Sequence, residues 1–212
     1  CMNHDNFPFK ALIVGPTKPG KTRYLGNFLS TTFYEKFDYV ILLCPTFIHN
    51  KTCDRSTEND KDLLVLTPLQ GWIDDCLKII IDVYKGTNTL IIFDDCAASR
   101  DVKRRTNKLV NLAFRGRHMR ISVWVLMQQM TSIAKPFREN PVALVIFYTP
   151  FAKDTTIIFE DHAGELIKEE QKELIAKLKR AKYSHLIFSP RHAFSLSFEI
   201  KFIKWTLVKR TL

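Results

Sequence analysis

Short apolar runs alternate along the chain with segments whose apolar residues recur at helical spacing. The runs are four to seven residues long and are bounded by polar or turn-forming residues, which is typical of buried strands. The predicted strands are residues 11–14, 39–43, 63–66, 89–93, 121–127 and 143–147. Alternation of such strands with helices predicts an α/β fold with a mostly parallel central sheet flanked by helices.

Helical spacing predicts four main helices, at about residues 21–30, 67–86, 102–115 and 164–182. A polar segment, residues 49–61, is expected to form a loop. Residues 184–188 and 194–202 alternate enough to form a β-hairpin that extends the sheet edge. The second helix carries apolar residues that we expect to pack in the core: Trp72, Ile73, Leu77, Ile80, Ile81 and Tyr84.

Length and composition predict a single compact domain. The chain has 212 residues, 46% of them hydrophobic, and no linker-like or repetitive segment divides it. We expect residues 1–163 to form the core and residues 164–212 a helix-plus-strand extension of the same domain. No apolar run approaches the roughly 18 to 20 residues that span a bilayer, and the start lacks the pattern of a signal peptide. These features indicate a soluble intracellular protein.

Five cysteines form no C-x-x-C pair and are odd in number, which suits a reducing compartment. Cys44, His49 and Cys53 resemble part of a zinc site, but the sequence offers no evident fourth ligand. A structural zinc ion is therefore not expected.

Directly after the first predicted strand, the chain matches the phosphate-binding pattern G-x-x-x-x-G-K-[ST]. A loop that aims successive N–H groups at a phosphate chain needs glycine where φ is positive or the backbone comes close. The lysine would neutralise β- and γ-phosphate charge, the threonine hydroxyl would bind Mg²⁺, and the following helix would add its dipole. The alternative is a glycine turn that binds nothing. The predicted ATP-binding residues are Gly15, Pro16, Thr17, Lys18, Pro19, Gly20, Lys21 and Thr22.

Two aspartates end the fourth predicted strand. In P-loop ATPases with an additional strand, an acidic residue here holds Mg²⁺ and its neighbour activates water. We assign Asp94 to the metal and Asp95 to the catalytic base. A solvated strand end is the alternative for these two carboxylates.

Gln128 follows the next predicted strand, which in this class of ATPase lies beside the phosphate loop. A polar side chain at that strand end is placed to touch the γ-phosphate or the attacking water, so Gln128 is a candidate sensor. The alternative is a glutamine that faces solvent.

The order of these motifs resembles the DNA-packaging ATPases of poxviruses and of other large or polinton-like DNA viruses, in the FtsK/HerA branch of P-loop NTPases. The similarity covers residues 9–160 and includes Gly-Pro-Thr-x-x-Gly-Lys-Thr, Ile-Ile-Phe-Asp-Asp and the Gly-Arg-His stretch before Gln128. Residues 143–147 and the segment through Asp154 resemble the last core strand of that family and the loop after it. The resemblance implies a RecA-like, additional-strand fold and a homo-oligomeric ring that uses ATP and Mg²⁺ to push double-stranded DNA into a capsid.

In such rings a neighbour's arginine stabilises charge on the γ-phosphate. The resemblance makes Arg138 the preferred catalytic arginine and Arg117 the reserve. An ordinary surface arginine is the alternative at either position.

Charge independently favours a polyanionic partner. Thirty-two Lys and Arg residues exceed 22 Asp and Glu residues by 10, and residues 103–120 contain seven basic and no acidic side chains. This composition predicts sequence-independent contacts with DNA phosphates, with a solvated helix face as the alternative. The basic carboxyl end would meet DNA or a capsid or portal vertex protein. The virion or the cytoplasmic virus factory of an infected cell is the expected location.

Two other functions remain open from the residues. A nucleotide or nucleoside kinase shares the phosphate loop, but no arginine-rich lid or acceptor-binding acidic motif is evident. A non-enzymatic DNA-binding scaffold draws support from Pro19, which has no N–H to offer a phosphate.

Overall fold

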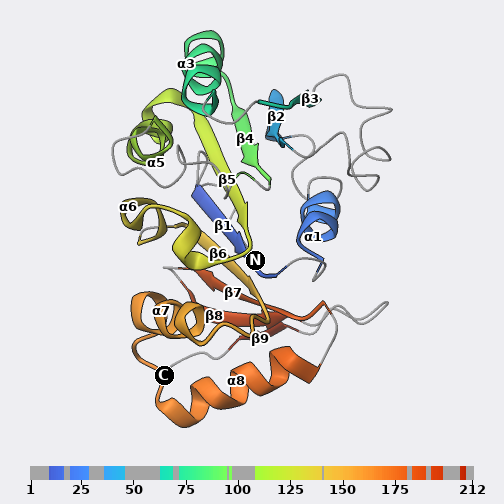
Figure 1. The fold of residues 1–212 in the computed structure, drawn as a ribbon, viewed down its shortest axis with the longest axis vertical. Helices are drawn as coiled ribbons and strands as arrows, with labels where there is room; N and C mark the ends of the chain where they lie inside the picture. The colour runs from blue at the N-terminus through green and yellow to red at the C-terminus, as the bar shows by residue number, and fades with distance from the viewer. Residues whose placement is uncertain are drawn as a thin grey trace.

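The computed structural model describes residues 10–16, 20–28, 36–45, 63–68, 72–94, 96, 108–139, 141–180, 183–189, 192–197 and 206–208. Within them, a nine-stranded sheet has the order β3-β2-β4-β5-β1-β6-β7-β8-β9. The first six strands in that order are parallel and the last three are antiparallel. The predicted α/β fold with a mostly parallel sheet is confirmed (Figure 1).

All six predicted core strands are present, with bounds that differ by at most one residue. The parallel strands are β1 (Lys10–Val14), β2 (Tyr39–Leu43), β3 (Leu63–Leu66), β4 (Thr89–Phe93), β5 (Ile121–Met127) and β6 (Ala143–Phe147). The antiparallel strands are β7 (His185–Ser189), β8 (His192–Ser197) and β9 (Thr206–Val208). The predicted hairpin at the sheet edge is therefore β7–β8, and β9 adds a strand that the sequence did not indicate.

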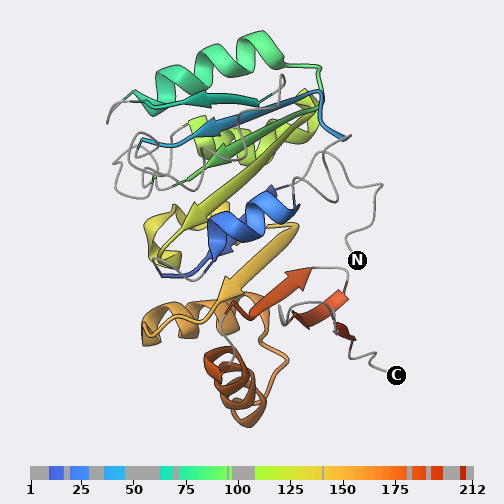
Figure 2. The same ribbon diagram turned by 90° about the vertical axis from the view of Figure 1, so that its right-hand side faces the viewer.

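Alternate residues of the parallel strands enter two cores on opposite faces of the sheet. On one face, Ala11 and Ile13 of β1 pack with Leu25 of α1 (Lys21–Phe28). On the other face, Leu12 and Val14 belong to a larger core covered by the remaining helices. These are α3 (Ile73–Tyr84), α5 (Lys108–Met119), α6 (Lys135–Arg138), α7 (Ala152–His162) and α8 (Lys168–Arg180). Figures 1 and 2 show α1 alone on its side of the described sheet.

Helix α3 begins later than predicted, and Trp72 is not a core residue. Its side chain is 61% exposed because Trp72 precedes the helix at the N-cap position, where helical spacing does not apply. The buried stripe instead consists of Ile73, Leu77 and Ile80, at i, i+4 and i+7. The predicted polar loop at residues 49–61 lies outside the described residues.

Helix α5 ends at Met119, beyond the predicted end at residue 115. Gly116, the first residue beyond the predicted end, is buried within the helix, against the Ile121 carbonyl. The chain reverses at Arg120, whose φ is +58°, and enters β5 directly. The close packing of α5 on β5 explains why the helix is longer than predicted. This contact cannot be predicted from the sequence of the helix alone.

The segment after β6 is also a correction. The resemblance predicts a loop through Asp154, but residues 152–154 are the first turn of the helix α7, which buries Asp154, Ile158 and Phe159. The β-branched residues of α7 have a low intrinsic preference for helix. We infer that burial of Ile158 and Phe159 on one side of the helix stabilises it. No helix in the described part of the chain is long and apolar enough to cross a membrane.

Candidate nucleotide-binding site

The phosphate loop joins the buried end of β1 to the start of α1. The Gly15 amide donates to the Met127 carbonyl of β5 at 3.1 Å, which fixes the beginning of the loop to the neighbouring strand. Gly20 has a φ of +99°, which suits glycine, and its carbonyl accepts from the Tyr24 amide at 2.8 Å in the first turn of α1. Residues 17–19, which include the unusual Lys18 and Pro19, lie outside the described residues.

The ammonium group of Lys21 lies against the start of the loop. Its Nζ donates to the Gly15 carbonyl at 2.7 Å and to the Pro16 carbonyl at 2.8 Å. The side chain thus folds back from the helix to the strand end instead of extending into solvent. This places a positive charge beside the α1 N-terminus, where backbone N–H groups favour an anion.

The carboxyl-terminal extension supports the loop from outside, which sequence reasoning missed. The Tyr183 ring packs on Gly20 so closely that a Cβ there would lie 2.8 Å from Tyr183 Cδ1. The Arg23 guanidinium lies 5.6 Å from the same ring centroid. One turn further along α1, Tyr24 meets His185 of β7 edge-on at 4.7 Å, and burial raises the pKa of Tyr24. Tyr183 belongs to no sequence motif, so its contact with the phosphate loop could not be predicted from sequence. The contact arises because Tyr183 lies just before β7.

The predicted metal-binding residues lie at the same edge of the sheet. Asp94 directly follows β4, is 6% exposed, and donates its amide to the Leu43 carbonyl at 2.9 Å. Thr22 occupies the first turn of α1. Asp95 lies outside the described residues. Among those described, no cluster of three or more His, Cys, Asp or Glu residues has the geometry to hold a metal.

Hydroxyl and carboxylate oxygens are the donors that Mg²⁺ prefers, and Mg²⁺ keeps waters and phosphate oxygens as its other ligands. Thr22 and Asp94 therefore fit the chemistry of a magnesium–nucleotide site. Of the partial zinc site, Cys44 is buried and forms no disulfide within the described part of the chain, whereas His49 and Cys53 lie outside it.

Gln128 occupies the position expected for a sensor relative to the loop. It is the residue after β5, and β5 lies between β4 and β1. Its predecessor Met127 holds the Gly15 amide, so one strand end carries both the loop contact and Gln128. The side chain of Gln128 is exposed. The structure thus brings Lys21, Asp94 and Gln128 to one edge of three adjacent strands, and their roles stay predictions.

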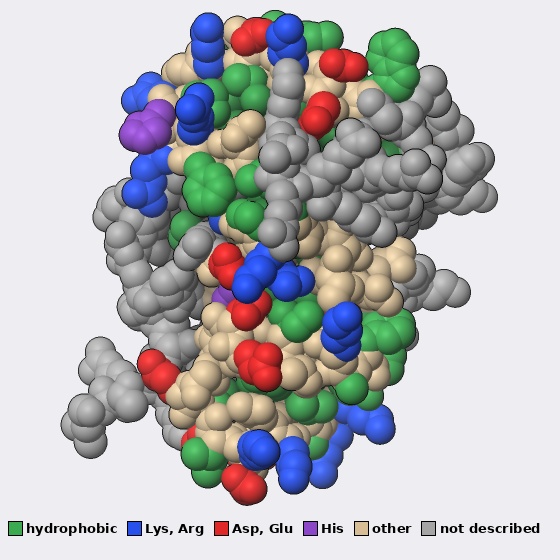
Figure 3. All heavy atoms as spheres, turned by 60° about the vertical axis from the view of Figure 1, so that its left-hand side comes forward, with side chains coloured by type: hydrophobic (Ala, Val, Ile, Leu, Met, Phe, Trp, Pro, Cys, Tyr) green, Lys and Arg blue, Asp and Glu red, His purple; other side chains and the backbone are tan. Residues whose placement is uncertain are grey.

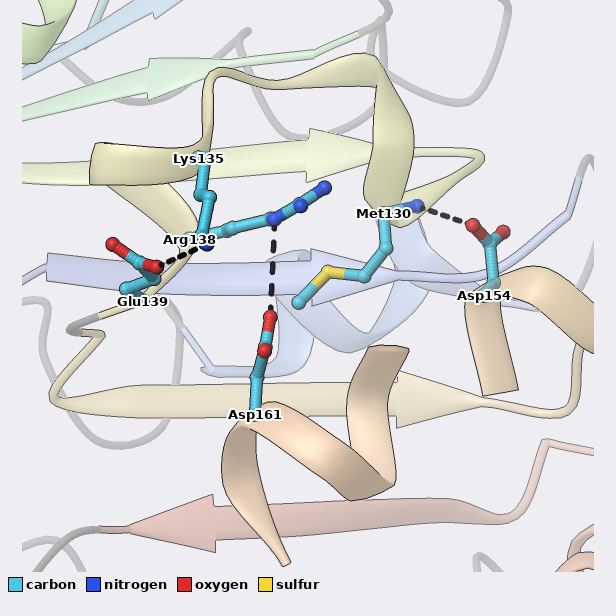
Figure 4. Close-up of polar contacts among 6 residues, drawn as sticks. All are labelled: Met130, Lys135, Arg138, Glu139, Asp154 and Asp161. Carbon is cyan, nitrogen blue, oxygen red and sulfur yellow. Dashed lines mark hydrogen bonds and ion pairs between the residues drawn. The ribbon is translucent and has the colours of Figure 1, made fainter. Parts of the chain in front are cut away.

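The two candidate arginines lie elsewhere in the subunit. Arg138 is at the end of α6, on the sheet face opposite α1, with Nε 3.9 Å from Asp161 Oδ2 of α7 (Figure 4). Its side chain is 16% exposed. Arg117 is exposed in the last turn of α5, at the amino end of β5 and hence at the sheet edge opposite the phosphate loop. Neither arginine is brought to the loop of its own subunit by these elements.

Solved structures of low sequence identity have the same fold. B204, the DNA-packaging ATPase of Sulfolobus turreted icosahedral virus, is 16% identical with a TM-score of 0.67, over 88% of this chain and 95% of that one. The genome-packaging NTPase B204 of Sulfolobus turreted icosahedral virus 2, in complex with AMPPCP, is 15% identical with a TM-score of 0.64, over 88% and 94%. The pCW3 conjugation coupling protein TcpA, with ATPgS, is 12% identical with a TM-score of 0.60, over 87% and 58%.

These likenesses confirm the P-loop ATPase fold. A comparison with curated protein sequences gives no match. The family described as poxvirus A32 protein matches residues 3–185, which is most of the chain. The chain therefore belongs to the poxvirus A32 protein family, the viral packaging-ATPase family that its motif order predicts.

Proposed function

We propose that this chain is a viral motor ATPase that hydrolyses ATP to move double-stranded DNA into a capsid. The observation that carries the proposal is the Lys21 ammonium, held at 2.7 Å and 2.8 Å by the two carbonyls that open the loop. Only one strand, β5, separates β1, which leads into this loop, from β4, which directly precedes Asp94. Family membership and the packaging NTPases among the structural neighbours support the same function.

The roles follow from position. The backbone N–H groups of residues 17, 18 and 20–22, at the start of α1, would hold the phosphates, and Lys21 would neutralise their charge. Gln128 would orient the attacking water, and Asp95, next along the chain from buried Asp94, would accept its proton. The complexes of the neighbouring B204 proteins with AMPPCP and ATP-gammaS support binding of ATP by this chain.

Magnesium would be held by the Thr22 hydroxyl and the Asp94 carboxylate together with water. Bound there, the ion would neutralise charge on the β- and γ-phosphates. The position of Asp94 directly after β4, one strand away from the strand that leads into the phosphate loop, supports this assignment, because Mg²⁺ prefers carboxylate oxygens.

A ring of identical subunits, with each nucleotide at a subunit boundary, would supply a further arginine. Arg138 is the proposed residue, although delivering it to a neighbour requires its contact with Asp161 to open. Arg117 is the reserve and is already exposed. Mixing Arg138→Ala with Lys21→Ala subunits tests this: recovered ATP turnover supports a shared site, and turnover no higher than that of the separate variants refutes it.

Basic surface supports a DNA partner. Arg115, Arg117 and Arg120 are exposed around the end of α5, and Figure 3 shows Lys and Arg gathered over this end and again over α8. Phosphate contacts of this kind release counterions, so DNA affinity should fall steeply with salt. A capsid or portal vertex protein is the proposed docking partner, in the virion or in the cytoplasm of the infected cell.

Steady-state ATP hydrolysis tests the proposal. The parent should turn over ATP without any acceptor substrate, which a nucleotide kinase does not do, and duplex DNA should raise the rate. Asp94→Asn should lose most of the activity, and the activity that remains should need a higher Mg²⁺ concentration. Parent protein that binds ATP without hydrolysing it would refute the motor and favour a scaffold.

A further inference from the structure

A buried carboxylate of helix α7 contacts the segment that follows β5, the strand before Gln128. Asp154, in the first turn of α7, is 2% exposed, and its Oδ1 accepts from the Met130 amide at 3.1 Å (Figure 4). Met130 begins the short 3₁₀ turn η5 (Met130–Ser132), two residues after Gln128. The contact therefore joins the chain just beyond Gln128 to a helix 24 residues further along the sequence.

This carboxylate is costly to bury, which indicates that its contact matters. Burial raises the pKa of Asp154, although the Met130 and Thr131 amides and the Arg138 charge act in the opposite direction. Its second oxygen, Oδ2, has no hydrogen-bond partner among the described residues. An apolar residue would avoid both costs, but it would leave the buried Met130 amide without this acceptor.

The backbone on the two sides of Gln128 is thus fixed at both ends. On one side, the Met127 carbonyl accepts from Gly15 at 3.1 Å, and on the other side, Met130 is held by Asp154. Gln128 and Gln129 lie between these anchors. Gln129 is extended, with φ −137° and ψ 140°, and makes no side-chain cap to η5. Asp154 therefore supplies the side-chain acceptor for the first amide of η5, which the Gln129 side chain does not.

We propose that Asp154 is a positioning residue for ATP hydrolysis, which holds the Gln128–Met130 turn so that Gln128 can meet the γ-phosphate or the attacking water. This inference rests on the proposed function, because it takes Gln128 as the sensor. It assigns α7 a part in the site through the segment that follows β5. A displacement of about 1 Å in a positioned group costs up to about 10²-fold in rate.

The test compares Asp154→Ala with Asp154→Asn by steady-state kinetics. Asp154→Ala removes the acceptor of the Met130 amide, so kcat should fall by about tenfold to 10²-fold. The KM for ATP and the affinity for a non-hydrolysable analogue should stay within about twofold, because the phosphate loop is untouched. Asp154→Asn keeps an acceptor oxygen and should retain more of kcat. Glu160→Gln is the matched control, since it removes an exposed carboxylate from the same helix and should leave kcat unchanged.

A double variant separates positioning from general support of the fold. If Asp154 acts through Gln128, Asp154→Ala should slow the Gln128→Ala enzyme little further. Equal fold losses in both backgrounds would overturn the inference, as would parent-like kcat in Asp154→Ala. If Asp154→Ala fails to fold, Asp154→Asn carries the same comparison, and equal losses in both backgrounds again refute it.

The same experiments distinguish failure of the proposed function from failure of this inference. A parent that does not hydrolyse ATP refutes the ATPase itself. An active parent with unchanged Gln128→Ala refutes the sensor and, with it, the role of Asp154.

Discussion

Gly116 gives the sharpest test of the packing between α5 and the sheet. A Cβ at this position would lie 2.7 Å from the Ile121 carbonyl oxygen and 4.0 Å from Leu112 Cδ1. Ordinary carbon–oxygen contacts are about 3.3 Å or longer, so the backbone would have to separate by about half an ångström. The carbonyl belongs to β5, which pairs with β4 and β1, and strand pairing on both sides resists that movement.

Two opposing effects set the magnitude of Gly116→Ala. Replacing glycine by alanine within a helix normally stabilises by about 0.5 to 1 kcal/mol. Overpacking against a fixed backbone costs about 1 to 3 kcal/mol. The collision therefore outweighs the propensity gain, and we expect a net loss of about 1 to 2 kcal/mol. For a chain of this length, the melting temperature should fall by roughly 2 to 8 °C.

Gly26→Ala is the matched control, because nothing lies within 4 Å of a Cβ built there in α1. Only the propensity gain remains, so this variant should be more stable than the parent by about 0.5 to 1 kcal/mol. Urea denaturation followed by circular dichroism measures both changes. If Gly116→Ala is as stable as the parent or more stable while Gly26→Ala behaves as expected, the packing argument is wrong.

Three further predictions concern the loop and its strand. Gly20→Ala should weaken nucleotide binding about tenfold or more, because φ is +99° at this position and Tyr183 lies 2.8 Å from the new Cβ. Adding Tyr183→Ala removes the collision but not the backbone strain, so it should restore only part of the affinity. Full restoration of the affinity, measured by calorimetry, would refute the contribution of backbone strain. Lys21→Ala should lower ATP hydrolysis about 10²-fold or more, and near-parent turnover would contradict the role of its ammonium. Burial lowers the pKa of Lys10 from 10.5 to about 8, so the unfolded chain binds more protons between those values and stability should rise with pH across that window. Lys10→Met should abolish that rise and should increase the free energy of unfolding at pH 7 by up to about 3 kcal/mol. The gain is reduced by the loss of the cation–π contact between Lys10 and the Phe137 ring, at 4.9 Å. An unchanged dependence of stability on pH in urea titrations would refute this.

The core strands could be predicted because their apolar runs are unbroken and sharply bounded. Residues 121–127 are buried throughout β5, as a strand covered on both faces requires. The parallel order then follows from alternation with helices, and it brings the ends of β1, β5 and β4 together. The relation of the phosphate loop to Asp94 and Gln128 was thus available from sequence, whereas Asp95 and the centre of the loop stay predictions.

The errors share a cause, because tertiary contacts overrode local signals. Gly116 lies one residue beyond the predicted helix end, yet it belongs to the helix and allows it to approach the Ile121 carbonyl. Asp154 reads as a loop residue, yet it enters a buried helix turn and accepts from Met130. Tyr183 carries no motif, and only the placement of β7 beside β6 brings it to Gly20. Such contacts join residues far apart in the chain, so periodicity and spacing cannot report them.

DNA-stimulated ATP turnover is the most direct test of the motor. Steady-state phosphate release should be measured with the parent and with Lys21→Ala, each in the presence and absence of duplex DNA of unrelated sequences at two salt concentrations. The account predicts Mg²⁺-dependent turnover by the parent, stimulation by every duplex that weakens at the higher salt, and almost no turnover by Lys21→Ala. Turnover that is equal in the two proteins, or that never responds to DNA, would contradict it.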